Sequence, residues 1–176
     1  MIKVLNKKTI LASAGMQADR ATLQKMMHAR AVMYAHSNRR DMSCPAAAQL
    51  LSNTLYFKRF FPYYTFNILA GLDEAGRGAV YTYDAIGSYE RTGYSCQGSG
   101  KDLIQPVLDN QLKAASPLVL PPQSSVTALP MEDALDLVKD AFAAATERDI
   151  YTGDAVEIVV VQPSGTTTEV MQLRKD

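Results

Sequence analysis

The spacing of hydrophobic positions switches along the chain between the period of a helix and the period of a strand. Leu23, Met27, Ala31 and Tyr34 recur every three or four positions, which predicts an amphipathic helix that begins near Gln17. The same spacing predicts three further helices. The expected helices span residues 17–37, 43–60, 101–112 and 132–149.

Local signals fix the ends of the second helix. Ser43 is a plausible N-cap and Pro45 falls in the first turn, where a missing N–H costs nothing. Pro62 cannot continue a helix, so we expect the helix to end near Phe60.

Strands are predicted where β-branched and aromatic residues alternate between turn-forming clusters. The continuous apolar run AVEIVVVQ is typical of a buried strand, and Pro163-Ser164-Gly165 predicts a hairpin turn to its partner. The expected strands span residues 2–5, 9–14, 63–72, 79–83, 88–95, 155–162 and 167–173.

Strands and helices come in groups rather than in strict alternation. This order favours an α+β fold, with antiparallel sheets covered by helices, over a βαβ fold. No repeat and no linker divides the chain, so we expect a single domain over residues 1–176. Residues 113–130 hold four of the eight prolines and are expected to form a surface loop.

Composition narrows the class of protein. The chain has 176 residues, of which 47% are hydrophobic, and 18 basic side chains balance 18 acidic ones. A nucleic-acid partner is not expected without a basic footprint, and no apolar run reaches the length of about 18 residues needed for a membrane span. Cys44 and Cys96 cannot build a disulfide framework and fit a reducing compartment.

The sequence does not contain the residues of common catalytic and ligand-binding motifs at the spacing that those motifs require. Gly98-Ser99-Gly100-Lys101 resembles part of a phosphate loop, but Ser95 and Asp102 stand where that motif needs a glycine and a hydroxyl, so a plain turn is favoured. His28 and His36 are eight residues apart and cannot share a metal as a helical pair spaced by four would. We therefore predict no cofactor and no metal, surface or partner-facing positions for both histidines, and buried, inert thiols for both cysteines.

Two clusters have more than one interpretation. Asp149, Thr152 and Asp154 follow the last helix, where carboxylates oppose the helix dipole, so a compensating contact is expected there. A turn is favoured over catalysis at this point. Six aromatic residues gather within nine positions around Lys58-Arg59, which suits either the core alone or the core together with a protein interface. They are Tyr56, Phe57, Phe60, Phe61, Tyr63 and Tyr64.

A family resemblance rests on several separate stretches. Residues 58–91, KRFFPYYTFNILAGLDEAGRGAVYTYDAIGSYER, together with ERDIYTGDA and the terminal LRKD, resemble the β-subunits of the 20S proteasome, most nearly the non-catalytic sixth position of the β-ring. The resemblance covers nearly the whole chain, and the loop 113–130 is its divergent part. It implies the four-layer αββα sandwich of the N-terminal-nucleophile hydrolases.

The resemblance also implies a function and partners. The chain is expected to be a non-catalytic subunit that assembles with α- and β-subunits in stacked heptameric rings of the cytoplasm and nucleus, and helps to enclose the chamber for protein degradation. Family matching places Ser99, Asp149 and Thr152 at positions that support the active site in catalytic members; here we expect them to hold loop geometry and not to catalyse.

The catalytic threonine of active members has no match in the chain. The resemblance places Met1 near the position of the supporting lysine, Thr9 is internal, and Lys8 stands where processing requires a glycine. We therefore expect the first strands of one sheet to be missing and the natural product to begin further upstream, with a shortened paralogue as the alternative. The rival functions are an active threonine-type peptidase subunit with its nucleophile upstream, and a free-standing binding module.

Overall fold

A computed structural model describes residues 1–112 and 129–175 of the chain. Of the predicted surface loop 113–130, residues 113–128 lie outside the described residues. The elements, in chain order, are β1 (Ile2–Asn6), β2 (Thr9–Gly15), α1 (Gln17–Asn38), α2 (Cys44–Phe57), β3 (Thr65–Leu72), β4 (Gly78–Tyr83), β5 (Tyr89–Thr92), α3 (Lys101–Leu112), α4 (Met131–Thr146), β6 (Ala155–Gln162) and β7 (Gly165–Gln172).

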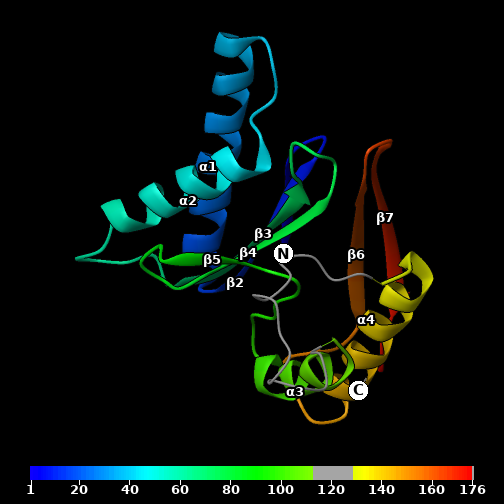
Figure 1. Ribbon diagram of the computed structural model, residues 1–176. Coiled ribbons are helices and arrows are strands. Elements are labelled where there is room, and N and C mark those ends of the chain that lie inside the picture. The colour runs from blue at the N-terminus through cyan, green and yellow to red at the C-terminus, as the bar shows by residue number, and fades with distance from the viewer. Residues whose placement is uncertain (113–128, 176) are drawn as a thin grey trace, which may run out of the picture.

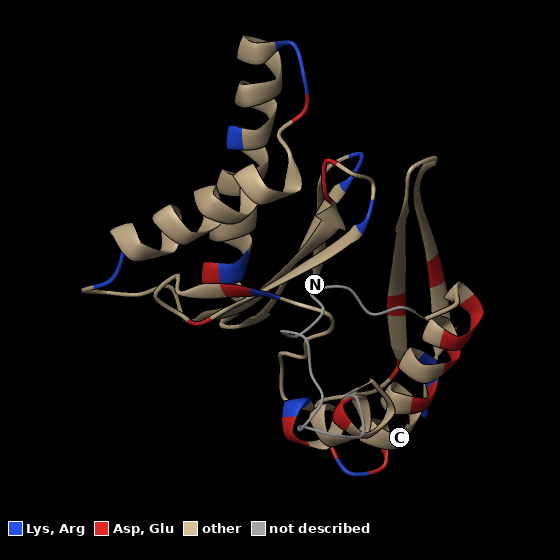
Figure 2. Cartoon of the chain, viewed as in Figure 1, with Lys and Arg blue, Asp and Glu red and all other residues tan. Residues whose placement is uncertain are grey.

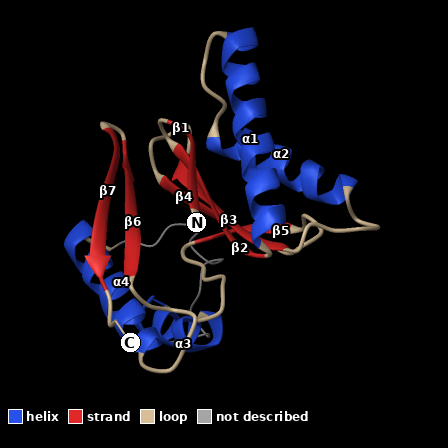
Figure 3. Ribbon diagram, turned by 180° about the vertical axis from the view of Figure 1, so that it is seen from behind, coloured by secondary structure: helices blue, strands red, loops and turns tan. Residues whose placement is uncertain are grey.

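Two antiparallel sheets and two helix pairs make up the described structure, which confirms the α+β prediction. The larger sheet has the strand order β1-β2-β3-β4-β5, and the smaller one is the hairpin β6-β7. Helices α1 and α2 cover one face of the larger sheet, while β6, β7, α3 and α4 lie beyond its other face (Figures 1 and 3). Among the described residues, no helix is long and apolar enough to cross a membrane.

The two faces of strand β3 contact different parts of the molecule. Its burial alternates, so that Leu69 is fully buried while Phe66 and Ile68 are only half-buried. Leu11 on β2 and Tyr81 on β4 pair with Leu69 in register, and all three belong to the main core beneath α1 and α2. The opposite face of β3 points toward the smaller sheet.

The helices form two separate cores. The main core joins α1 and α2 to the larger sheet and contains Leu23, Met27, Leu51 and Leu55, which are almost completely buried. A second, smaller core joins α3 to α4. Ser43 caps α2, because its hydroxyl accepts a hydrogen bond from the amide of Ala46, as the sequence predicts.

Four expectations need correction. Helix α4 ends at Thr146 rather than at Asp149, because the chain turns from Glu147 onward. Helix α2 ends at Phe57 rather than near Phe60. Residues 58–60 already form a turn, so the helix stops several residues before Pro62. Strand β5 covers only residues 89–92 of the expected 88–95. Strand β6 is not buried on both faces: only Val156 and Ile158 are buried, since β6 pairs with a single strand and borders an open cleft.

The turn between β3 and β4 is held by one carboxylate. Asp73 is 8% exposed and accepts hydrogen bonds from the backbone amides of Ala75 and Arg77 and from the guanidinium groups of Arg77 and Arg91. The amide of Arg77, followed by the Arg91 side chain, lowers the pKa of Asp73 to about 2. The ionised carboxylate therefore stabilises the folded chain.

This contact predicts a defined acid sensitivity. In the unfolded chain an aspartate titrates with a pKa of about 3.9, so the stabilisation by Asp73 is complete above that pH and is lost as the pH falls toward about 2. In Asp73→Asn, the dependence of unfolding free energy on pH between those values should be smaller. Denaturant unfolding at a series of pH values measures it, and Glu74→Gln, an exposed neighbour in the same turn, should behave as the wild type.

Candidate functional site

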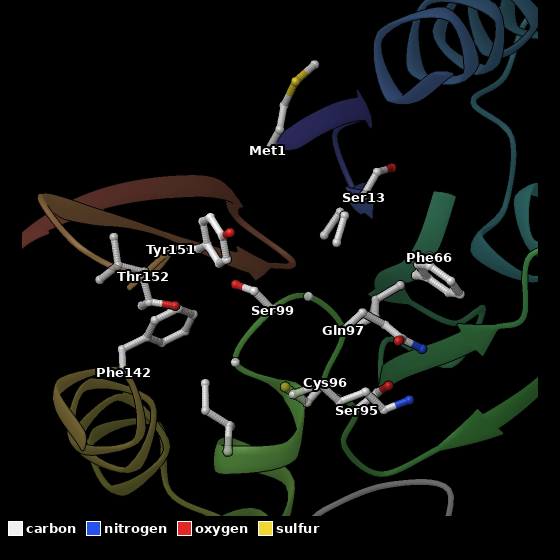
Figure 4. A pocket seen from close by; sticks show the side chains of 18 of the residues that line it. Met1, Ser13, Phe66, Ser95, Cys96, Gln97, Ser99, Phe142, Tyr151 and Thr152 are labelled. Atoms are coloured by element: carbon white, nitrogen blue, oxygen red, sulfur yellow. The ribbon is translucent and has the colours of Figure 1, made fainter. Parts of the chain in front are cut away.

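A large cleft separates the two sheets. It has a volume of about 1240 Å³ and is lined by residues of β2, β3 and β6, by the segment before α3 and by α4. Phe66 and Ile68 contribute the face of β3 that the main core does not use. In Figure 4, Ser99, Tyr151 and Thr152 lie near one another, with Met1 and Ser13 across from them.

Three residues singled out in the sequence meet at this cleft. The Ser99 hydroxyl donates a hydrogen bond of 2.7 Å to Oδ2 of Asp149, and the Thr152 hydroxyl donates one of 2.6 Å to the same oxygen. The backbone amide of Tyr151 donates to Oδ1 at 3.1 Å. The carboxylate at the end of α4 thus has the compensating contacts expected of it.

Local structure brings Ser99 to Asp149 across fifty positions of sequence. Gly98 has φ +124°, a value that suits glycine, and the chain turns directly into α3 because the Lys101 amide donates to the Gly98 carbonyl. The segment after α4 closes through a hydrogen bond from the Thr152 amide to the Asp149 carbonyl. Gly98-Ser99-Gly100-Lys101 is therefore a turn into a helix, as favoured over a phosphate loop.

The three donors change the acidity of Asp149. The Thr152 hydroxyl, then the Ser99 hydroxyl and then the Tyr151 amide lower its pKa below the ordinary value. A carboxylate that stays ionised in this way is a weak base. Ser99 thus donates its hydrogen bond to a carboxylate that is a weak base, and no histidine lines the described part of the cleft.

Removing the hydroxyl donors tests this account of Asp149. Thr152→Val should raise the pKa of Asp149 toward the unperturbed value of about 3.9, and Ser99→Ala should raise it by less, because the Thr152 hydroxyl is the larger cause. Carboxyl NMR titration measures both shifts. Ser164→Ala, in the distant hairpin turn, should leave the titration of Asp149 unchanged; an equal titration in all three variants would contradict the account.

Other candidates lie apart from this group. His36 is exposed on α1, as expected, whereas His28 is half-buried and its Nδ1 is buried without a hydrogen bond. Cys44 is buried in the main core, where burial raises its pKa to about 11, and burial also raises the pKa of the half-buried Cys96 thiol. Both thiols are consequently poor nucleophiles. Among the described residues, no group of three or more His, Cys, Asp or Glu side chains could hold a metal ion.

A buried polar network, which was not predicted from the sequence, lies beside the cleft. The Ser13 hydroxyl donates to Oδ1 of Asn67 at 2.8 Å, and Nε2 of Gln24 lies 3.1 Å from the Ser13 hydroxyl. Gln24 and Asn67 are almost fully buried. A polar position on an otherwise apolar helix face, such as Gln24, was the available signal. This network fixes the end of β2 where it borders the cleft.

Most of the aromatic cluster lies on the surface of the described chain. Only Tyr63 packs against the main core. Its other members are between 55% and 87% exposed; they are Tyr56, Phe57, Phe60, Phe61 and Tyr64. The core-alone interpretation is therefore wrong.

Comparison with known proteins agrees with the resemblance found in the sequence. A family model described as "Proteasome subunit" matches residues 1–161. "Proteasome subunit beta type-1" of Arabidopsis thaliana is 61% identical over 175 residues, which are 99% of this chain and 78% of that protein. The proteins of the same name from Oryza sativa subsp. japonica and Drosophila melanogaster are 62% and 42% identical over 172 residues, 98% of this chain and 78% and 72% of their own lengths. The chain belongs to the proteasome subunit family.

Proposed function

We propose that the chain is a non-catalytic β-subunit of the 20S proteasome core particle. It would occupy one place in a heptameric β-ring, contact subunits of its own and adjacent rings, and wall part of the chamber in which other subunits cut peptides. The observation that carries the proposal is identity of about three residues in five, over 99% of the chain, to a plant protein named proteasome subunit beta type-1. Such particles are expected in the cytoplasm and nucleus.

The second part of the proposal is that this subunit does not catalyse peptide hydrolysis. Thr9 begins a strand inside the chain and is fully buried, so it cannot present a hydroxyl and a free amine together to a substrate. Ser99 and Thr152 both donate to Asp149. We assign these three residues to holding the segment before α3 against the end of α4.

The proposal extends to the complete fold. The layers run helix pair, larger sheet, smaller sheet, helix pair, in keeping with a four-layer αββα sandwich (Figure 1). The smaller sheet has two strands against five, and the cleft beside it is lined partly by Phe66, Ile68 and Val156. We propose that strands outside these 176 residues complete the smaller sheet and fill the cleft, which would cover the strand edges that are unpaired in the described structure.

Recovery of the tagged chain from cells tests the proposed function. If the proposal holds, the chain elutes with other proteasome subunits in a particle of several hundred kilodaltons, and amide exchange at β6 is far slower there than in the isolated chain. Recovery as a free monomer, with no other proteasome subunit, would contradict the ring assignment. Incorporation with unchanged exchange at β6 would contradict only the proposed completion of the sheet.

A further inference from the structure

The end of α2 and the turn that follows it expose several large aromatic side chains. Phe57, Phe60 and Phe61 are 81%, 87% and 86% exposed, and Tyr56 is 55% exposed. With Lys58 and Arg59 these four residues form a continuous segment of sequence, residues 56–61, which we call the aromatic tip. It protrudes at the far left of Figure 1, away from both sheets. Monomeric proteins rarely leave several large aromatic side chains together in water.

The aromatic tip carries a positive charge held against its rings. The guanidinium carbon of Arg59 lies 4.9 Å from the centre of the Tyr56 ring and 4.3 Å from that of Phe60. The ammonium of Lys58 lies 5.7 Å from the centre of the Tyr63 ring. These contacts orient both cations without neutralising them. Aromatic side chains with arginine are the combination that dominates binding energy at protein interfaces.

Neither cation has a carboxylate partner in an ion pair within the described chain. The described ion pairs join Arg77 and Arg91 to Asp73, Lys139 to Glu169, and Arg174 to Glu147. Beside the tip, Asp19 accepts a hydrogen bond from the backbone amide of Tyr64. The two charges of the aromatic tip therefore remain available to a partner that supplies carboxylates.

This chain carries an acidic surface of the complementary kind on α4. Four exposed acidic residues lie in the first three turns of α4, at the opposite end of the molecule (Figure 2). They are Glu132, Asp133, Asp136 and Asp140. Opposite charges at opposite ends of a neutral molecule suit a head-to-tail contact between subunits, which is the type of contact that closes rings.

We propose that the aromatic tip docks on a carboxylate-bearing helix face of a neighbouring, non-identical proteasome subunit. The proposal rests on the proposed function and deepens it by naming the surface and the chemistry of the partner. The aromatic side chains of the tip supply the apolar contact. Lys58 and Arg59 favour a partner that presents acidic side chains and disfavour one that presents basic side chains.

A charge reversal tests the contact in the assembled particle. In Lys58→Glu/Arg59→Glu, the fraction of chain found in the particle, in competition with co-expressed wild-type chain, should fall by about tenfold or more, because like charges then face each other. Arg39→Glu/Arg40→Glu is the matched control: it reverses two exposed charges that also follow a helix, and should stay within about twofold of the wild type. Circular dichroism of the purified variants checks that each is folded.

A second measurement needs no variant. A zero-length carbodiimide reagent applied to wild-type particles should join the Lys58 amine to an aspartate or glutamate of a different subunit, which peptide mass spectrometry identifies. Equal incorporation of the charge-reversed chain, or joining of Lys58 only to a second copy of this chain in a mixture of isotopically labelled copies, would overturn the proposal. The proposed function would survive either result. It would fall only if the wild-type chain were absent from the particle.

Discussion

Replacing Leu51 by alanine is expected to lower the free energy of unfolding by about 3 kcal/mol. Leu51 lies on α2, is completely buried, and belongs to the core between the helix pair and the larger sheet. The truncation removes apolar contacts and leaves a cavity that packed neighbours fill only in part. A loss of that size is a large share of the 5–15 kcal/mol that typically holds a domain together.

Denaturant unfolding of the purified chain measures the effect of Leu51→Ala. The matched control is Leu103→Ala, the same truncation at a leucine of α3 that is 42% exposed, which should change the unfolding free energy by no more than about 0.5 kcal/mol. Equal losses in the two variants would mean that the core beneath α1 and α2 is not packed as described.

Gly87→Ala is expected to destabilise the chain by about 3 kcal/mol, through backbone strain at a positive φ and through a steric clash with α2. Gly87 has φ +98°, and an added Cβ would lie 2.5 Å from the carbonyl oxygen of Ser52. The Gly87 carbonyl also accepts a hydrogen bond of 2.7 Å from the Ser52 hydroxyl, so the turn between β4 and β5 presses directly on α2. An alanine must both adopt a strained conformation and displace the helix.

Gly76→Ala is the control for Gly87→Ala, because Gly76 also has positive φ, at +75°, but has open space around its added Cβ. It should cost only the conformational part, about 1 kcal/mol. Gly78→Ala, with neither feature, should be close to neutral. Thermal or denaturant unfolding of the three variants gives the comparison; if Gly87→Ala and Gly76→Ala cost the same, the close approach of the turn to α2 is wrong.

Periodicity predicted the elements that pack on one side only. The spacing of Leu23, Met27 and Ala31 located α1, and the Gly165 turn located the β6–β7 hairpin, because each signal depends only on neighbouring residues. The burial of β6 was predicted wrongly for the same reason. A run such as AVEIVVVQ records an apolar preference, while the number of strands that pair with it is set by distant parts of the chain.

The site depended on long-range structure that local patterns do not contain. Spacing alone could not join Ser99 to Asp149, which lie fifty positions apart, and only the family resemblance put them together. The sequence did indicate that a carboxylate at the end of α4 requires compensation, although it could not name the donors. The exposure of Phe60 and Phe61 was equally hidden, because an aromatic residue in sequence looks the same in a core and on an interface.

The central claim is that the chain is incorporated into the 20S proteasome as a non-catalytic subunit. Labelling of intact particles tests this claim most directly. Proteasome particles that contain the tagged chain are treated with a peptide probe whose electrophile reacts with N-terminal threonine, and each subunit is then weighed by mass spectrometry. The account predicts that this subunit is present in the same amount as the other β-subunits and carries no probe, while other subunits of the same particles are labelled. Probe attached to this subunit, or its absence from the particles, would contradict the account.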